Sequence, residues 1–184
     1  MKRNFSISLF LAILGVLLLS QIAFAEITRT FDQFANTFTV ESKRNINMND
    51  KANLTVNFSK IFSPELRQPI YSLTLIASGN EYFFFSDYFY YLVTGEELGE
   101  KVNWLDTDSS SPNKNPVYTI ASRGLLPESK LFKVIKDGKV ITFRIHFKDK
   151  QPFIFYTSEA AIKEWQEVIA FDLKTELEKL NDKK

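Results

Sequence analysis

The chain has 184 residues, 45% of them hydrophobic and 24% charged, a composition that suits one globular domain with its own core. Its 23 basic and 22 acidic side chains leave a net charge of +1, so the chain lacks the positive excess that nucleic-acid binding needs. Cysteine is absent and histidine occurs once, which excludes disulfides, thiolate zinc sites, iron–sulfur clusters, cysteine nucleophiles and histidine-rich metal sites.

The first 25 residues have the three parts of a secretory signal peptide. Two basic residues follow Met1, an apolar run covers residues 5–19, and the segment ends in Ala23-Phe24-Ala25. The two alanines fit the shallow pockets of a signal peptidase, so the sequence predicts a signal peptide over residues 1–25 and cleavage before Glu26. The alternative is an uncleaved membrane anchor, because an apolar run of this length nearly spans a bilayer.

Cleavage leaves a single mature domain over residues 26–184. A chain of this length can build a sufficient core without disulfides. The short signal and the absence of cysteine favour a bacterial protein of the periplasm or the exterior, with no integral membrane span once the signal is removed.

Most of the mature chain alternates between apolar and polar residues with the period of strands. We expect a short strand over residues 38–41, a polar connection over 42–51, and further strands over 52–58, 70–77 and 117–122. Residues 106–116 are rich in Asp, Ser, Pro and Asn and are expected to form a long loop.

Residues 81–93 form a dense aromatic run. Strand alternation divides the run into a tyrosine-rich face (Tyr82, Phe84, Tyr88, Tyr90, Leu92) and a second face (Phe83, Phe85, Phe89, Tyr91, Val93). Either both faces are core, or one face is a platform for sugar rings or an apolar ligand. If one face is exposed, the tyrosine-rich face is the better candidate. The residues predicted to bind a ligand are Tyr82, Tyr88, Tyr90 and Trp104.

The Asp-Gly pair at 137–138 predicts a β-hairpin, because a type I′ turn needs positive φ at both of its central positions. The strands of this hairpin would be residues 131–136 and 139–147. Its register places Phe132, Val134, Ile141 and Phe143 on an inward face and Thr142, Arg144 and His146 on a polar face. Residues 152–156 are a candidate third strand of the same meander.

The hydrophobic period changes after residue 157. Ser158 can cap a helix, and Ile162, Trp165, Ile169 and Leu173 follow at spacings of three and four residues. The sequence therefore predicts one amphipathic C-terminal helix over about 158–180. The expected fold class is α+β, a mainly antiparallel, aromatic-rich sheet packed by this helix.

Phe31-Asp32-Gln33-Phe34, followed by Thr39-Val40, resembles the opening of a group of uncharacterised bacterial secreted proteins. Those proteins begin their mature domain with a Phe-Asp-x-Phe segment that leads into a first strand. The late Asp-Gly turn and the closing amphipathic helix are similar to that group too. The resemblance implies a compact α+β domain and assigns neither an activity nor a catalytic residue.

Candidate catalytic and metal-binding residues are few. His146 could serve a Ser–His–Asp hydrolase only with an orienting carboxylate, and no Gly-x-Ser-x-Gly elbow occurs, so we interpret it as a surface strand histidine. Residues 106–110 alternate oxygen ligands as calcium loops do, but Ser111 and Val117 stand where an EF-hand needs Gly and Glu. No catalytic residue, metal site or cofactor is predicted.

The sequence thus favours a secreted or periplasmic, non-catalytic protein that binds an envelope protein or a small apolar or carbohydrate ligand. The alternative is a metal-independent hydrolase that uses carboxylates or serine. An enzyme needs acid and base groups within hydrogen-bond reach of its substrate, whereas a ligand carrier needs an apolar cavity.

Overall fold

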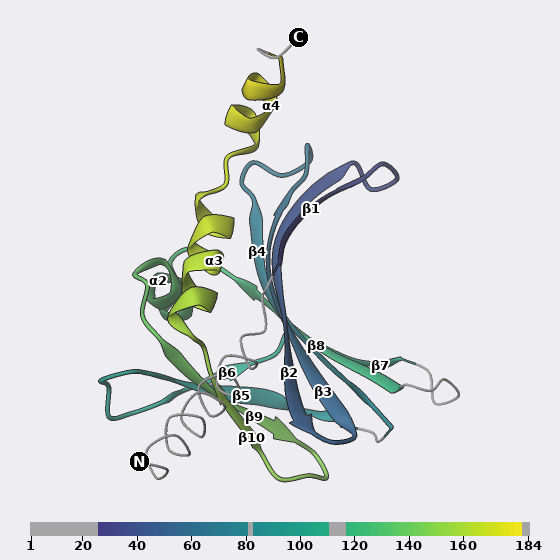
Figure 1. Cartoon of the computed structure of the whole chain (residues 1–184), viewed down its shortest axis with the longest axis vertical. Helices are drawn as coiled ribbons and strands as arrows, with labels where there is room; N and C mark the ends of the chain where they lie inside the picture. The colour runs from purple at the N-terminus through teal and green to yellow at the C-terminus, as the bar shows by residue number, and fades with distance from the viewer. Residues whose placement is uncertain (1–25, 81–82, 111–116, 182–184) are drawn as a thin grey trace, which may run out of the picture.

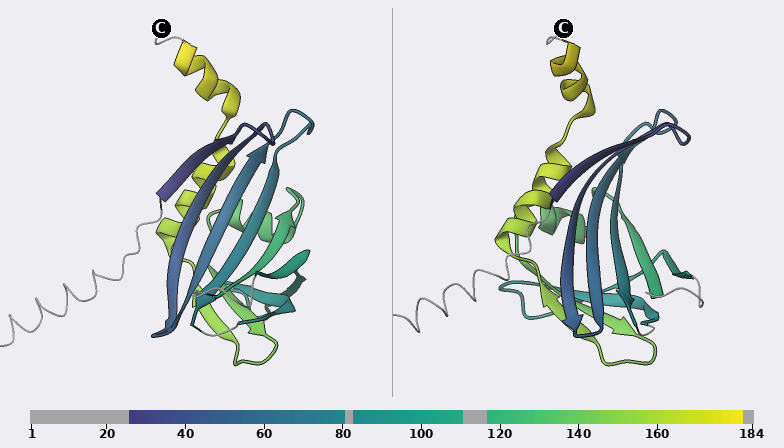
Figure 2. Two further views of the ribbon diagram at one scale, coloured as in Figure 1. Left: turned by 90° about the vertical axis from the view of Figure 1, so that its right-hand side faces the viewer. Right: turned by 45° about the vertical axis from the view of Figure 1, so that its right-hand side comes forward.

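The computed structural model describes residues 26–80, 83–110 and 117–181, which form two antiparallel sheets and three helices. The larger sheet has the strand order β1-β2-β3-β4-β8-β7, and the smaller sheet has the order β10-β9-β5-β6. The smaller sheet runs across the lower end of the larger one (Figure 1). The larger sheet is strongly curved, and α3 lies against one of its faces (Figure 2). The predicted α+β class is confirmed.

The strands of the larger sheet are β1 (Glu26–Asp32), β2 (Thr37–Asn49), β3 (Ala52–Phe62), β4 (Ile70–Gly79), β7 (Asp106–Ser110) and β8 (Val117–Leu125). Those of the smaller sheet are β5 (Phe85–Val93), β6 (Glu100–Asn103), β9 (Ile141–Phe147) and β10 (Phe153–Tyr156). The helices are α2 (Lys130–Lys136), α3 (Glu159–Ala170) and α4 (Leu173–Asn181).

Alternation of side chains explains most of β3 and β4, in which buried apolar residues alternate with more exposed ones, although Ser59 and Lys60 near the end of β3 are also buried. The inward set is buried and consists of Leu54, Val56, Phe58, Leu73, Leu75 and Ala77. The predicted polar connection over residues 42–51 is wrong for most of its length, because β2 continues to Asn49 and the turn occupies only residues 50–51. Polar residues in this part of β2 alternate with the half-buried Ile46 and Met48.

Helix α3 joins the two sheets, as the predicted amphipathic helix should. Ser158 Oγ accepts a hydrogen bond from the N–H of Ala161 and so caps the N-terminus of the helix. The buried Trp165 stacks on Phe58 of the larger sheet, with 5.3 Å between ring centroids, and meets the edge of Phe143 of the smaller sheet at 6.4 Å. The core therefore lies between the sheets, with Trp165 linking them.

The stretch predicted as one helix over about 158–180 consists of two helices. Phe171 leaves helical geometry with ψ of 127°, and its ring lies 5.7 Å from that of Phe38 and 6.0 Å from that of Phe62. Asp172 then accepts a backbone hydrogen bond from Lys174 and starts α4. Helix α4 leads away from the two sheets (Figure 1).

The predicted hairpin over residues 131–147 is wrong in its first half, because residues 130–136 form α2. Ser129 caps this helix by accepting from the N–H of Phe132. At the other end Gly138 has φ of +77°, its N–H donates to the Ile135 carbonyl, and the N–H of Lys139 donates to the Val134 carbonyl. These two bonds are a Schellman motif, so Gly138 takes its positive φ as a helix end rather than as a hairpin turn.

The second half of that prediction holds. In β9 the residues Ile141, Phe143, Ile145 and Phe147 are buried and Arg144 is exposed. β10 pairs with β9 as the expected neighbouring strand. Of the expected loop over 106–116, residues 106–110 form β7 and the remainder lies outside the described residues, as does the predicted signal peptide over 1–25. None of the helices in the described part of the chain is long and apolar enough to cross a membrane.

Candidate functional site

The aromatic strand β5 has one core face and one solvent-facing face. Phe85, Phe89, Tyr91 and Val93 are buried, whereas Tyr88, Tyr90 and Leu92 are half-buried. The face division predicted from alternation is therefore correct. Core on both faces does not hold for this strand, because β5 separates the interior from the solvent.

The structure brings together two of the four residues predicted to bind a ligand. The rings of Tyr88 and Tyr90 meet edge to face on the outer side, with centroids 5.7 Å apart. Trp104 is only 7% exposed and packs on the inner side, 4.3 Å from the ring of Phe89. Tyr82 lies outside the described residues. The ligand-binding role of these residues stays a prediction.

His146 lies on the outer face of β9 with Arg144, between the rings of Tyr88 at 5.1 Å and Tyr90 at 5.6 Å. Its Nε2 is buried and has no hydrogen-bond partner among the described residues. Burial lowers the pKa of His146, and the positive charges of Arg144 and Lys101 lower it further. The charges that act on His146 are thus cationic, whereas a triad histidine needs a carboxylate.

A pocket of about 960 Å³ opens between β2, α3 and β10, and we call it the β2–α3 pocket. Its apolar wall includes Ile46, Met48, Val56, Phe155 and Trp165. Asparagines from β2 and the segment that leads from β10 into α3 add polar groups. Sequence reasoning did not find this pocket, because its walls come from chain segments about 100 residues apart.

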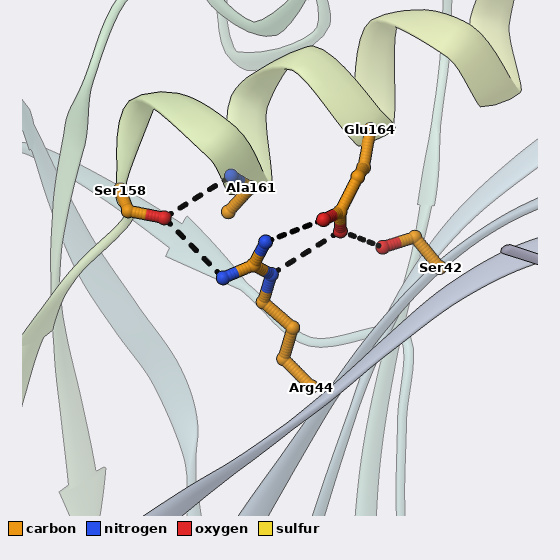
Figure 3. A network of polar contacts seen from close by, with 5 residues as sticks. All are labelled: Ser42, Arg44, Ser158, Ala161 and Glu164. Atoms are coloured by element: carbon orange, nitrogen blue, oxygen red, sulfur yellow. Dashed lines mark hydrogen bonds and ion pairs between the residues drawn. The ribbon is translucent and has the colours of Figure 1, made fainter. Parts of the chain in front are cut away.

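One side of the β2–α3 pocket is fixed by an ion-pair network between β2 and α3 (Figure 3). Arg44 Nη2 donates to Glu164 Oε1 at 2.6 Å, and Arg44 Nε donates to Glu164 Oε2 at 3.2 Å. The buried Ser42 donates to the same carboxylate at 3.0 Å, and Arg44 Nη1 donates to Ser158 Oγ at 3.3 Å. Such a two-bond contact fixes the guanidinium and compensates its charge.

Lys60 holds the opposite end of α3. Its side chain is buried, and its Nζ donates to the carbonyls of Ile169 at 2.7 Å and Phe171 at 2.6 Å. A cation at this position satisfies carbonyls that a helix leaves unpaired at its C-terminus. Burial lowers the pKa of Lys60, and the negative charge of Asp172 opposes that shift. Helix α3 is thus attached to the larger sheet at both ends.

Trp165 lines the pocket, but its indole Nε1 is inaccessible to solvent and has no hydrogen-bond partner among the described residues. A buried N–H without a partner is costly, so Trp165 contributes packing to the wall rather than an accessible polar group. No three His, Asp or Glu side chains of the described residues lie close enough together to hold a metal ion.

No protein-family model matches the chain, and neither a curated protein nor a solved structure matches it. Function is therefore inferred from the geometry of the pocket and of the outer face of the smaller sheet.

Proposed function

We propose that this chain is an exported, non-catalytic binding protein that holds an uncharged, mainly apolar ligand in the β2–α3 pocket. The observation that carries the proposal is the pocket itself. Its volume of about 960 Å³ lies within the range of small-molecule sites, and side chains such as Ile46, Met48 and Phe155 give it an apolar wall. Export is supported by the basic, apolar and Ala-x-Ala parts of residues 1–25.

The charge of the pocket favours a neutral ligand. Among the described residues that line it, Arg44 is the only one that is charged. Glu164 already compensates that charge through two hydrogen bonds. An anionic ligand would have to break this pair or remain unpaired in an apolar site, and both are costly.

The polar groups of the lining narrow the class of ligand further. The asparagine side chains of β2 carry amide N–H groups that can donate to an oxygen acceptor. The ligand class that fits is an apolar molecule with a hydroxyl, ether or carbonyl oxygen.

The hydrolase alternative has weaker support. Ser158 lines the pocket, but its Oγ accepts from the N–H of Ala161 and from Arg44, which is the role of a helix cap. His146 is not among the residues that line the pocket. A nucleophile and its base need to be within hydrogen-bond reach of each other, and these two residues belong to different sites.

The test is displacement of an uncharged dye, N-phenyl-1-naphthylamine, from the purified chain. We expect saturable binding of the dye and displacement by dodecanol at lower concentration than by dodecanoate, which has the same tail and a charged head. Ala160→Phe places a ring in the pocket from an exposed position and should weaken dye binding by about tenfold or more.

Ala170→Phe is the matched control, because Ala170 is exposed on the same helix and does not line the pocket. Equal weakening by both substitutions, or tighter binding of dodecanoate than of dodecanol, would contradict the proposal.

A further inference from the structure

A row of cation, ring and cation crosses the outer face of the smaller sheet. Tyr90 of β5 pairs in register with Lys101 of β6 on one side and with Arg144 of β9 on the other. Side chains paired in this way project from the same face. Since neighbouring strands are about 4.8 Å apart, the two cationic positions are separated by about 10 Å.

Tyr88 and His146 widen this row into a cluster of three rings that are inclined to one another, by 84° between the two tyrosines. The ring of His146 contacts both tyrosine rings, and Lys101 Nζ lies 4.0 Å from the centroid of Tyr88. The pairing of β5 with β9 shifts register between Phe85 and Phe89, opposite His146, as at a β-bulge. Bulges re-aim side chains, and here the bulged segment carries Tyr88. We call Tyr88, Tyr90, Lys101, Arg144 and His146 the outer platform.

The cations of the outer platform are available for a ligand. Arg144 and Lys101 form no ion pair with an acid within the described part of the chain. Both side chains are exposed. Burial and these two charges lower the pKa of His146, whose ring packs on Tyr88 and Tyr90 and whose Nε2 is inaccessible to solvent. The surface therefore offers aromatic faces, hydrogen-bonding groups and uncompensated positive charge together.

We propose that the outer platform binds an acidic polysaccharide, with a sugar ring packed against Tyr90 and acidic groups paired with Lys101 and Arg144. The apolar faces of pyranose rings pack on aromatic rings, which lose little entropy on binding. The guanidinium of Arg144 presents a planar fork that matches a carboxylate or sulfate. One cation lies on each side of the Tyr90 ring. This arrangement suits a polymer in which acidic groups recur along a chain of sugar rings.

An acidic polysaccharide fits this surface better than an anionic membrane. Membrane-binding surfaces insert apolar side chains among the lipid tails. Tyr88 and Tyr90 instead lie half-buried on the sheet and contact each other and His146. The proposal is also independent of the β2–α3 pocket, because no residue of the outer platform lines that pocket.

The experiment is calorimetric titration of the purified chain with three acidic probes, polygalacturonate, alginate and hyaluronate. Dextran serves as the neutral polysaccharide, and phosphatidylglycerol vesicles serve as the membrane. We expect binding to at least one acidic polymer, weakened by salt, and no binding to dextran. Tyr90→Ala should weaken binding by about tenfold, and Arg144→Gln and Lys101→Gln by up to about fivefold each.

Two controls remove an exposed aromatic ring and an exposed cation elsewhere. Phe34→Ala acts at the turn between β1 and β2, where Phe34 is 104% exposed, and Lys163→Gln acts on the exposed side of α3. Both should bind as the unchanged chain does. Arg144→Gln alters an exposed side chain, so its folding should be preserved and its binding interpretable even if Tyr90→Ala is unstable.

The proposal is overturned if none of the acidic polymers binds, or if dextran binds as tightly as they do. Binding to the vesicles alone would assign the platform to membranes. Equal losses in the control and platform variants would show that the polymers bind elsewhere.

Discussion

At the scale of single residues, two buried or half-buried cations fix α3. Arg44 forms an ion pair with Glu164, whereas Lys60 donates hydrogen bonds to the backbone carbonyls of Ile169 and Phe171. A buried charge stabilises a fold only if its hydrogen bonds are satisfied. The partners of both cations supply those bonds, so each is expected to contribute to stability as well as to the position of the pocket wall.

Lys60→Met should lower the free energy of unfolding by about 2 kcal/mol. Methionine has about the length of lysine but no ammonium group. The substitution therefore leaves the carbonyls of Ile169 and Phe171 without their donor. Urea unfolding followed by circular dichroism measures the change. Lys163→Met, on the exposed side of the same helix, should change stability by less than about 0.5 kcal/mol. A Lys60→Met protein as stable as this control would disprove the capping role.

His146→Phe should change how stability depends on pH. Burial and the charges of Arg144 and Lys101 lower the pKa of His146 in the folded chain below the ordinary histidine value of 6.5. Between that lowered pKa and 6.5 the unfolded chain binds a proton that the folded chain does not, so His146 destabilises the fold progressively as pH falls. Above this interval the residue makes no pH-dependent contribution.

The difference in unfolding free energy between His146→Phe and the unchanged chain should therefore be constant above 6.5 and shift in favour of the variant at acid pH. Urea unfolding at a series of pH values measures it. Arg144→Gln removes one of the two cations and should reduce the effect. A difference that is the same at every pH would show that the pKa of His146 does not change on folding.

At the scale of elements, α2 shows how a helix end can carry the sequence signature of a hairpin. Gly138 has the positive φ that the Asp-Gly pair indicates, but Asp137 has φ of −76° and ends the helix. The Schellman bonds to Val134 and Ile135 make the conformation of Gly138 essential to this end.

Gly138→Val should therefore lower stability by about 2 kcal/mol, because a β-branched residue tolerates positive φ poorly. Gly138→Asn should cost less, since asparagine adopts this conformation more readily. A Cβ at position 138 lies 3.0 Å from Gln166 Nε2, so both variants share that close contact and it cancels in the comparison. Thermal unfolding of the pair measures the difference, and equal losses would contradict this explanation.

Local sequence pattern predicted β3, β4, β8 and β10 and the faces of β5 and β9, because burial on one side imposes alternation, but it did not predict β1, β6 or β7. It failed for residues 131–136, since a short apolar run satisfies both a helix and a strand period. It also missed the division of α3 from α4. The apolar spacing continues through that point, whereas the packing of Phe171 on Phe38 and Phe62 and the hydrogen bonds of Lys60 at the end of α3 come from distant parts of the chain.

The two candidate sites differ in how much of each could be predicted from the sequence. Alternation placed Tyr88 with Tyr90 and Arg144 with His146, but only the pairing of β5 with β9 joins these two sets into one surface. The β2–α3 pocket could not be found from the sequence at all. Its wall depends on the extension of β2 past Ser42, in a segment whose polar composition resembles a loop.

At the scale of the whole molecule, the smaller sheet separates two surfaces of different chemistry. Its inner side contributes Phe155 to the β2–α3 pocket, where the lining is mainly apolar and Arg44 is compensated. Its outer side carries the outer platform, where two cations have no acidic partner in the described chain. An apolar molecule and an acidic polymer could therefore be bound at the same time without competing for one surface.

Export is a further part of the proposed function, and the position of the predicted cleavage site allows it to be tested. Strand β1 begins at Glu26, which pairs with Lys43 of β2. Cleavage before Glu26 would therefore remove the apolar N-terminal segment without removing any residue of the described sheet.

We expect the exported chain to lack residues 1–25 by intact-mass measurement. Ala25→Ser should still be cleaved because serine is small, whereas Ala25→Phe should block the peptidase pocket and leave a full-length product in the membrane fraction. If the unchanged chain also remains full-length and membrane-bound, residues 1–25 are an anchor and the mature domain is tethered rather than released.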